Sequence, residues 1–286
     1  MKIRNYNCVS NDKYEQKIAS ALKEVDGQLK EKSLEEHIVD LGNCIGKEIL
    51  LFPFNHMTEI SAYGGNVVWD GEFLGKNGDT IYNDLEELLK NLKFNWEDDT
   101  LLSTINSARL LQRNGIKVLY SVSGPMTILN GIIDITRVFK GFRRDRKKVF
   151  EIFKIIMTDL EQYISLLNEN WIRWISFSDS IFSVDILGPK VFSQIMTEII
   201  HPFLRKITRK FTNIQIVLCP KISLGLMDCG LASLEEVFVE SGLNYLQVCE
   251  SLRDKANILG KVCPKDETFC TDNCKVLHNI ILVEEK

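Results

Sequence analysis

The hydrophobic and polar positions of the chain alternate between helix-like and strand-like spacing. In residues 13–46, Ile18, Leu22, Val25 and Leu29 recur at intervals of three and four, which predicts a helix. Apolar runs typical of buried strands lie at 49–52, 116–122, 171–177 and 214–218, with weaker candidates at 66–69, 234–239, 257–259 and 279–283. Among these strands we expect helices at 58–63, 83–92, 98–114, 127–138, 145–168, 189–211 and 245–253.

Short apolar strands that alternate with longer helices indicate parallel βαβ units, and therefore an α/β fold. No strand candidate is followed by Gly-x-Gly-x-x-Gly, which disfavours a dinucleotide-binding Rossmann domain. The length of 286 residues fits a single (β/α)8 barrel of the TIM type. We expect residues 1–46 to form an N-terminal helical cap and residues 47–286 to form the barrel, with an abbreviated C-terminal end because the strands after Leu218 are weak.

Composition and charge exclude several classes of protein. With 45% hydrophobic and 26% charged residues, the chain is globular rather than disordered. A net charge of −4 lacks the basic excess of a nucleic-acid-binding protein, so we expect no nucleic-acid partner. No apolar run approaches the ~20 residues of a membrane helix, and the N-terminus has no signal-type apolar region. We therefore expect a cytoplasmic protein without membrane contact, whose eight cysteines are reduced.

One segment has a local basic excess. It is expected between two helices, where it forms either a solvated loop or a surface that docks an acidic protein partner. Phe142 alone provides too little aromatic surface for stacking on nucleic-acid bases. The basic residues are Lys140, Arg143, Arg144, Arg146, Lys147 and Lys148.

Candidate functional residues follow the strands. In barrels of this type the active site lies at the carboxyl ends of the strands. There, Glu59 and His56 are candidates for acid–base catalysis or metal binding, and His56 alternatively caps a helix. Asp179 is a candidate general base or substrate contact, or else it caps the next turn. Ser123 and Asp185 are candidate substrate-binding residues at two further strand ends.

Two cysteines occupy corresponding positions. Cys219 directly follows the strand at 214–218, and Cys263 follows the weaker strand at 257–259. Two cysteines that each end a different strand can converge as thiolates on one zinc ion, and alternatively both are small buried side chains. The spacing of Cys263, Cys270, Cys274 and His278 matches no compact zinc motif. We interpret the remaining cysteines as structural: Cys8, Cys44, Cys229 and Cys249.

Four segments, in this order, carry a resemblance to a known family. They are FPFNHMTE at 52–59 with Tyr63-Gly64-Gly65, SVSGPMT at 121–127, ISFSD at 175–179 with DILGP behind it, and VLCPKIS at 217–223. On these segments the chain resembles the uroporphyrinogen decarboxylase superfamily, and within it the branch of corrinoid-dependent methyltransferases. The likeness extends from about Ile49 to Ser223 and more loosely to the C-terminus.

The resemblance implies a chemistry. In this branch, zinc binds a small thiol acceptor, and the thiolate attacks the methyl group of a corrinoid carried by a partner protein. By resemblance, Cys219 and Cys263 would bind zinc, His56 or Glu59 would complete the ligand set, and Asp179 would face the substrate. Val217 stands where the branch has its histidine ligand, and valine cannot bind a metal.

The resemblance therefore predicts a zinc-dependent enzyme of anaerobic one-carbon metabolism that moves a methyl group between a corrinoid and a thiol-type acceptor. Two other functions stay open. The first is a decarboxylase-type lyase without metal, although the arginine-containing N-terminal segment of the porphyrinogen decarboxylases is absent. The second is a non-catalytic barrel that binds a tetrapyrrole or a corrinoid protein. The sequence leaves the oligomeric state open.

Overall fold

The computed structural model describes residues 3–4, 6, 12–25, 33–45, 48–54, 56–68, 76–273 and 276–284. The tertiary contacts divide the chain into two compact units. One unit comprises residues 12–172, and the other comprises residues 1–11 together with 173–286. Each unit contains its own parallel strands with helices between them, so the architecture is mixed α/β.

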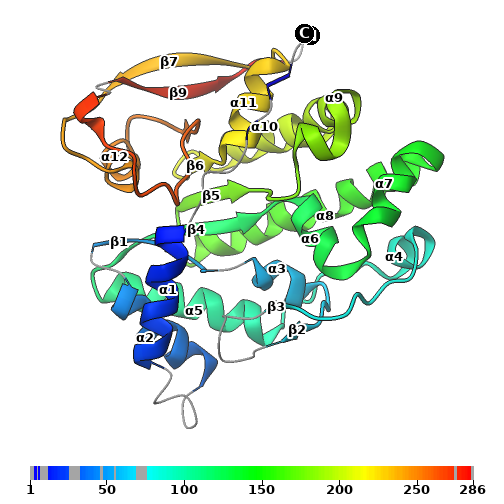
Figure 1. Cartoon of the computed structure of the whole chain (residues 1–286), viewed down its shortest axis with the longest axis horizontal. Coiled ribbons are helices and arrows are strands. Elements are labelled where there is room, and N and C mark those ends of the chain that lie inside the picture. Colours follow the sequence, from blue (N-terminus) through cyan, green and yellow to red (C-terminus); the bar gives the residue numbers. More distant parts are fainter. Residues whose placement is uncertain are drawn as a thin grey trace. The chain divides into compact units, whose positions relative to one another are not determined.

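The unit of residues 12–172 begins with two helices. These are α1 (Asp12–Val25) and α2 (Leu34–Ile45), which lie side by side, and α2 also packs on α5 (Asp99–Arg113) (Figure 1). The single helix predicted over 13–46 is therefore two helices, and its residues 26–32 lie outside the described part of the chain.

Two parallel strands form the centre of this unit. β1 (Ile49–Phe52) pairs with β4 (Lys117–Ser123), with Phe52 opposite Tyr120. A short antiparallel pair, β2 (Val67–Val68) and β3 (Lys76–Asn77), replaces the strand predicted at 66–69, whose Trp69 is outside the described residues. The further helices of the unit are α3 (Met57–Ala62), α4 (Leu85–Asn91), α6 (Pro125–Ile132), α7 (Ile135–Arg144) and α8 (Arg146–Glu169).

Aspartates determine where four of these helices begin. Asp84, Asp98, Asp134 and Asp145 each accept a hydrogen bond from a backbone N–H in the first turn of α4, α5, α7 and α8 respectively. The cap at Asp134 explains why the helix predicted over 127–138 is in fact two helices. The basic segment is helical too: it ends α7 and begins α8, with Asp145 between the two helices, so the prediction of a loop there was wrong.

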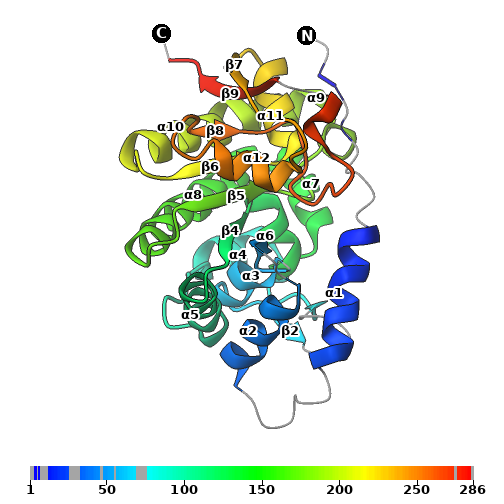
Figure 2. The ribbon, with the colours of Figure 1, turned by 90° about the vertical axis from the view of Figure 1, so that its left-hand side faces the viewer.

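The second unit contains three parallel strands. β5 (Trp174–Ser178), β6 (Gln215–Leu218) and β8 (Ile258–Leu259) pair in this order, with Val217 of β6 opposite Leu259 (Figure 2). β5 begins three residues later than the strand predicted at 171–177. Trp171 has a positive φ of 65°, which is incompatible with an extended strand.

Helices connect these strands. α9 (Val184–Ile195), a π-helical segment (Met196–Ile200) and α10 (His201–Lys210) follow one another without a break. Gly188, with φ 71° and ψ 156°, is a non-helical kink inside α9. The helix predicted over 189–211 therefore starts after this kink as expected, and a short helical segment from Val184 precedes it. The other helices of the unit are α11 (Pro220–Asp228), α12 (Tyr245–Ser251) and a 3-10 turn at Thr271–Asn273.

An antiparallel ribbon completes this unit. β7 (Ala232–Phe238) pairs along its whole length with β9 (Val276–Leu282), drawn in orange and red in Figure 1. The strands predicted at 234–239 and 279–283 are therefore present, but they are antiparallel and not barrel-type strands. Among the described residues five strands have parallel partners, and closure into an eight-stranded barrel stays a prediction.

No helix in the described part of the chain combines the length and apolar character needed to cross a membrane.

Candidate functional site

The carboxyl ends of β1 and β4 bring three of the candidate residues together. β1 ends at Phe52 and β4 ends at Ser123, and because the strands are parallel neighbours they end at the same edge. Helix α3 starts directly after β1 and carries Glu59 in its first turn, preceded by His56 at the N-cap position. His56 makes no side-chain capping hydrogen bond there, so the capping role considered for it is not observed.

Ser123 joins the other two residues. Its backbone N–H donates to Oε1 of Glu59 at 3.0 Å, and its Oγ lies 3.2 Å from Nδ1 of His56. Glu59 and Ser123 are each only 1% exposed, whereas His56 is partly exposed. The three residues therefore form a polar chain, through the backbone N–H and the hydroxyl of Ser123, that leads from a buried carboxyl group to a partly exposed imidazole.

The environment of Glu59 changes its acidity. Burial raises the pKa of this carboxyl group from 4.5 to about 7, although the amide and hydroxyl groups of Ser123 act in the opposite direction. Desolvation is therefore the dominant effect. A carboxyl group with a pKa near 7 can both accept and release a proton at neutral pH, which is what a general acid–base catalyst requires.

Buried tyrosines lie around this carboxyl group. Tyr63 donates a hydrogen bond to Oδ2 of Asp159 at 2.8 Å, and the hydroxyls of Tyr120 and Tyr163 lie 2.7 Å apart. Burial raises the pKa of all three phenols, and the negative charge of Glu59 raises each further. The tyrosines are therefore neutral hydrogen-bonding groups at physiological pH.

Aromatic rings make the surroundings of these tyrosines apolar. Phe52 packs against Tyr120 with ring centroids 5.9 Å apart, and Phe94 packs against both Tyr63 at 5.0 Å and Tyr163 at 6.0 Å. Sequence reasoning did not select the tyrosines. Tyr63 lies in one of the four family-like segments and Tyr120 in the apolar strand β4, but neither segment indicates that Tyr163 of α8 approaches them.

Asp179 and Asp185 belong to the second unit. Asp179 follows β5, is 1% exposed, and accepts a hydrogen bond from the backbone N–H of Phe182 at 3.2 Å. It therefore stabilises the turn after β5, as one of the two predicted roles requires. Asp185 is exposed in the first turn of α9, where a negative charge interacts favourably with the helix N-terminus.

Cys219 and Cys263 both lie in this second unit, after neighbouring parallel strands. Cys219 follows β6 at the start of α11, and its backbone N–H donates to the carbonyl of Phe177 at 3.1 Å. Cys263 lies in the loop after β8, which is attached to α11 by a hydrogen bond from the Lys261 N–H to Ser223 Oγ at 2.9 Å. Both cysteines are partly buried.

These cysteines fit a zinc ion only in part. Thiolates are donors that zinc prefers, but zinc sites have at least three protein ligands. Val217, in the position of the expected histidine, is completely buried in β6. Over the described ranges, no three His, Cys, Asp or Glu side chains are grouped so that they could hold a metal ion.

The remaining cysteines have varied environments. Cys249 is buried, and its burial raises the pKa of the thiol to about 12, which suits the structural role predicted for it. Cys229 is partly buried, with its Sγ 3.7 Å from Ser193 Oγ, whereas Cys44 and Cys270 are exposed. Cys8 and Cys274 lie outside the described residues, so the structural role predicted for Cys8 stays a prediction.

Comparisons with known proteins identify a fold but not a family. No protein-family model matches the chain, and no curated protein matches it. Among solved structures it is similar to a methyltransferase from Methanosarcina mazei, with a TM-score of 0.57 and 17% sequence identity. The match covers 73% of this chain but 65% of that protein, which is less than two thirds of its length. At this identity the similarity shows that the two chains share a mixed α/β fold.

Proposed function

We propose that the chain is a methyltransferase-like enzyme that moves a methyl group between a corrinoid, carried by a partner protein, and a thiol-type acceptor. The observation that carries this proposal is the buried Glu59, linked through Ser123 to His56 at the ends of two parallel strands. The fold shared with the Methanosarcina mazei methyltransferase and the four family-like segments support the same class of reaction.

Methyl transfer to a thiol needs a proton acceptor. The sulfur must lose its proton before it attacks the methyl carbon, and the carbon–cobalt bond then breaks with its electron pair left on cobalt. A free thiol has a pKa of about 8.5 and is mostly protonated at neutral pH. Glu59, with a pKa of about 7, accepts this proton, and His56 is the route by which the proton reaches solvent.

The other candidate residues have supporting roles in this proposal. Ser123 orients the Glu59 carboxylate through its backbone N–H and places its hydroxyl next to His56. Asp179 and Asp185 would contact the substrate, in addition to the turn and helix that they already stabilise.

Zinc remains part of the proposal as a separate component. Cys219 and Cys263 would supply two ligands, and a bound zinc ion would lower the pKa of the acceptor thiol. Because the described residues supply no group of three ligands, we derive no step through a metal. We expect protein purified without chelator to contain zinc that Cys219→Ser loses. Less than about 0.2 zinc per chain, unchanged in Cys219→Ser, would contradict the metal component alone.

The reaction is tested with a methylated corrinoid and small thiols. We expect the wild-type protein to form the methyl thioether, detected by mass spectrometry, as the absorbance of the methyl–cobalt bond is lost. Glu59→Gln should lower the rate at pH 7 by about 10²–10³, because the proton acceptor is gone. The matched control is Glu151→Gln, which alters an exposed carboxylate of α8 and should leave the rate unchanged.

Two outcomes would replace this proposal. Release of carbon dioxide from uroporphyrinogen, without any methyl transfer, would show a decarboxylase-type lyase. Tight binding of a corrinoid protein or a tetrapyrrole, with no turnover of any methyl donor, would show a binding protein.

A further inference from the structure

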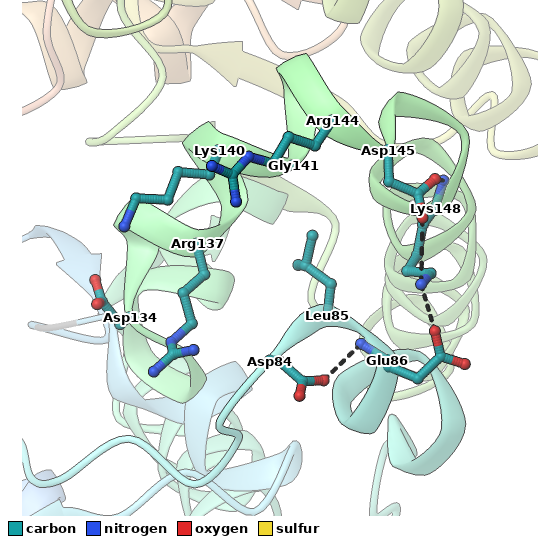
Figure 3. A pocket seen from close by; sticks show the side chains of 10 residues that line it. All are labelled: Asp84, Leu85, Glu86, Asp134, Arg137, Lys140, Gly141, Arg144, Asp145 and Lys148. Atoms are coloured by element: carbon teal, nitrogen blue, oxygen red, sulfur yellow. Dashed lines mark hydrogen bonds and ion pairs between the residues drawn. The ribbon is translucent and has the colours of Figure 1, made fainter.

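A pocket lies in the unit of residues 12–172, between α7 and the starts of α4 and α8 (Figure 3). Its volume is about 490 Å³, within the range of pockets that bind small molecules. None of its lining residues belongs to the site around Glu59. They are Asp84, Leu85, Glu86, Asp134, Arg137, Lys140, Gly141, Arg144, Asp145 and Lys148.

The four carboxylates of the pocket already have partners. Asp84, Asp134 and Asp145 accept hydrogen bonds from the backbone N–H groups that begin α4, α7 and α8, at 2.9–3.2 Å. Glu86 forms an ion pair with Lys148, which also contacts Asp145 at 3.2 Å. Figure 3 shows the Lys148 amine between these two carboxylates. Of the four basic side chains that line the pocket, Lys148 is therefore neutralised within the protein.

The other three cations differ from Lys148. Arg137, Lys140 and Arg144 are exposed and lie on one face of α7, because they are spaced by three and four residues. Within the described residues none of the three forms a hydrogen bond or an ion pair. Arg137 lowers the pKa of both Asp84 and Asp134, and Lys140 lowers the pKa of Asp134, so the charge of Arg144 is the least compensated of the three.

The segment around the pocket reinforces this positive charge. Residues 134–148 contain seven basic and two acidic side chains, a net charge of +5 in a chain whose total is −4. Arg146 lies over the ring of Phe150 and Lys147 pairs with Glu151, so these two are occupied outside the pocket. Asp84 and Glu86 also line the pocket and reduce this local charge from +5 to +3, so an anion that approaches still meets an attractive field.

The pocket also has an apolar part. Leu85 points toward α7, where a Cβ atom at Gly141 would lie 2.5 Å from its Cδ1 atom (Figure 3). The glycine is thus required for the close approach of Leu85 to α7. The resulting surface can cover the organic part of a ligand while its charged end contacts α7.

We propose that this pocket binds a phosphorylated small molecule. Lys140 and Arg144 would bind the phosphate group, and Leu85 would contact the organic part. A phosphate monoester carries up to two negative charges and three acceptor oxygens, which match one ammonium and one guanidinium group. The pocket is larger than a phosphate ion alone requires, which favours an esterified phosphate.

The test measures binding of phenyl phosphate and inorganic phosphate to the full chain by titration calorimetry at low salt. We expect phenyl phosphate to bind with a Kd below about 1 mM and more tightly than inorganic phosphate. Lys140→Gln and Arg144→Gln should each weaken its binding by about tenfold, because each removes a charge-assisted hydrogen bond. Arg143→Gln is the matched control, since Arg143 is exposed on the same helix but does not line the pocket.

Several results would overturn the proposal. Equal weakening by Arg143→Gln would show diffuse attraction to the basic segment rather than a built site. No binding of phenyl phosphate up to about 10 mM would exclude the ligand class. Binding of an acidic polypeptide such as polyglutamate, without binding of phenyl phosphate, would show instead that the surface docks an acidic protein. Unchanged thermal unfolding of each variant would confirm that the substitutions leave the fold intact.

Discussion

Glu59 links acidity and stability at the scale of a single residue. Its carboxyl group is buried and accepts a hydrogen bond from Ser123, and burial has the largest effect on its pKa. The protonated form is therefore favoured in the folded protein up to a pH of about 7. In the unfolded chain the same group releases its proton near pH 4.5.

This difference predicts how stability depends on pH. Between pH 4.5 and 7 the folded state holds a proton that the unfolded state has released, so the free energy of unfolding falls as the pH rises. The contribution of Glu59 over this range is about 3 kcal/mol. In Glu59→Gln, which does not titrate, we expect urea denaturation to show a correspondingly flatter pH dependence. Glu151→Gln should retain the wild-type slope, and an equally steep slope in Glu59→Gln would refute the raised pKa.

Sequence reasoning predicted part of this site. Glu59, His56 and Ser123 were selected because they follow strands, and parallel strands that are neighbours end at one edge. The partners Tyr163 and Asp159 were not predicted, because they lie on α8 and nothing in the local sequence shows that they approach β4 and α3. Tyr163 and Asp159 reach the site only because α8 packs there in the folded protein.

At the scale of elements, α3 is positioned by close packing against α6. A Cβ atom at Gly131 of α6 would lie 2.4 Å from Cδ1 of Ile60 on α3. Ile60 follows Glu59 directly, so this contact determines where α3 holds the carboxyl group. The glycine is thus a requirement of the site as well as of the core.

We therefore predict that Gly131→Ala destabilises the protein. The added methyl group must displace Ile60, which should lower the free energy of unfolding by about 1–3 kcal/mol. Asn130→Ala, in the neighbouring and partly exposed position of α6, should change it by less than about 1 kcal/mol. Chemical denaturation of the two variants compares them directly. If Gly131→Ala were as stable as the wild type, Ile60 could move aside without lowering the free energy of unfolding, which would contradict the prediction.

Elements that depend on local sequence were predicted, whereas those that depend on a partner distant in sequence were not. Strands β1, β4, β5 and β6 were located within a few residues, because buried apolar runs depend on local sequence. The direction of β7 was missed, because its partner β9 lies about 40 residues further along the chain and either direction satisfies the same pattern. Helices α6 and α7 were predicted as one helix, because the apolar spacing continues across the cap at Asp134 that separates them.

At the scale of the whole molecule, the second unit combines two distant parts of the chain. Residues 1–11 belong with 173–286, and Arg4 attaches this N-terminal part to α11. The Arg4 side chain donates to Asp228 at 2.9 Å and forms an ion pair with it at 2.7 Å, while the Arg4 backbone N–H donates to the same carboxylate. Burial acts to raise the pKa of Asp228, but the hydrogen bonds and ion pair with Arg4 together outweigh it and lower the pKa, so the pair persists into the acidic range.

Loss of this attachment should expose the N-terminal part to proteases. Trypsin cleaves after arginine, and the Arg4 side chain is held by Asp228 in the wild type. We predict that Asp228→Asn, which removes the negative charge, is cleaved after Arg4 several-fold faster, as measured by mass spectrometry of the intact chain. Cleavage after Arg113, remote in sequence, should be unchanged. If the wild type and Asp228→Asn were cleaved after Arg4 at equal rates, the Arg4–Asp228 pair would not restrain this segment.

The alternation of strands and helices predicted the α/β class correctly, because that alternation reflects parallel βαβ units. The number of parallel strands and the division of contacts into two units were not predictable in this way. They depend on which strands pair in the folded chain, and a strand of two residues such as β8 has too short an apolar run to show this in the sequence. The domain boundaries proposed from the sequence, at 1–46 and 47–286, stay predictions.

The ribbon of β7 and β9 has a consequence for the behaviour of the protein in concentrated solution. Within the described part of the chain β7 pairs only with β9, so its outer row of peptide groups is an open edge, and Phe238 at its end is 76% exposed. Glu235 and Glu236 lie in the middle of this edge, and two molecules that paired there would bring like charges together. Electrostatic repulsion thus opposes self-assembly, and acid or high salt removes that protection.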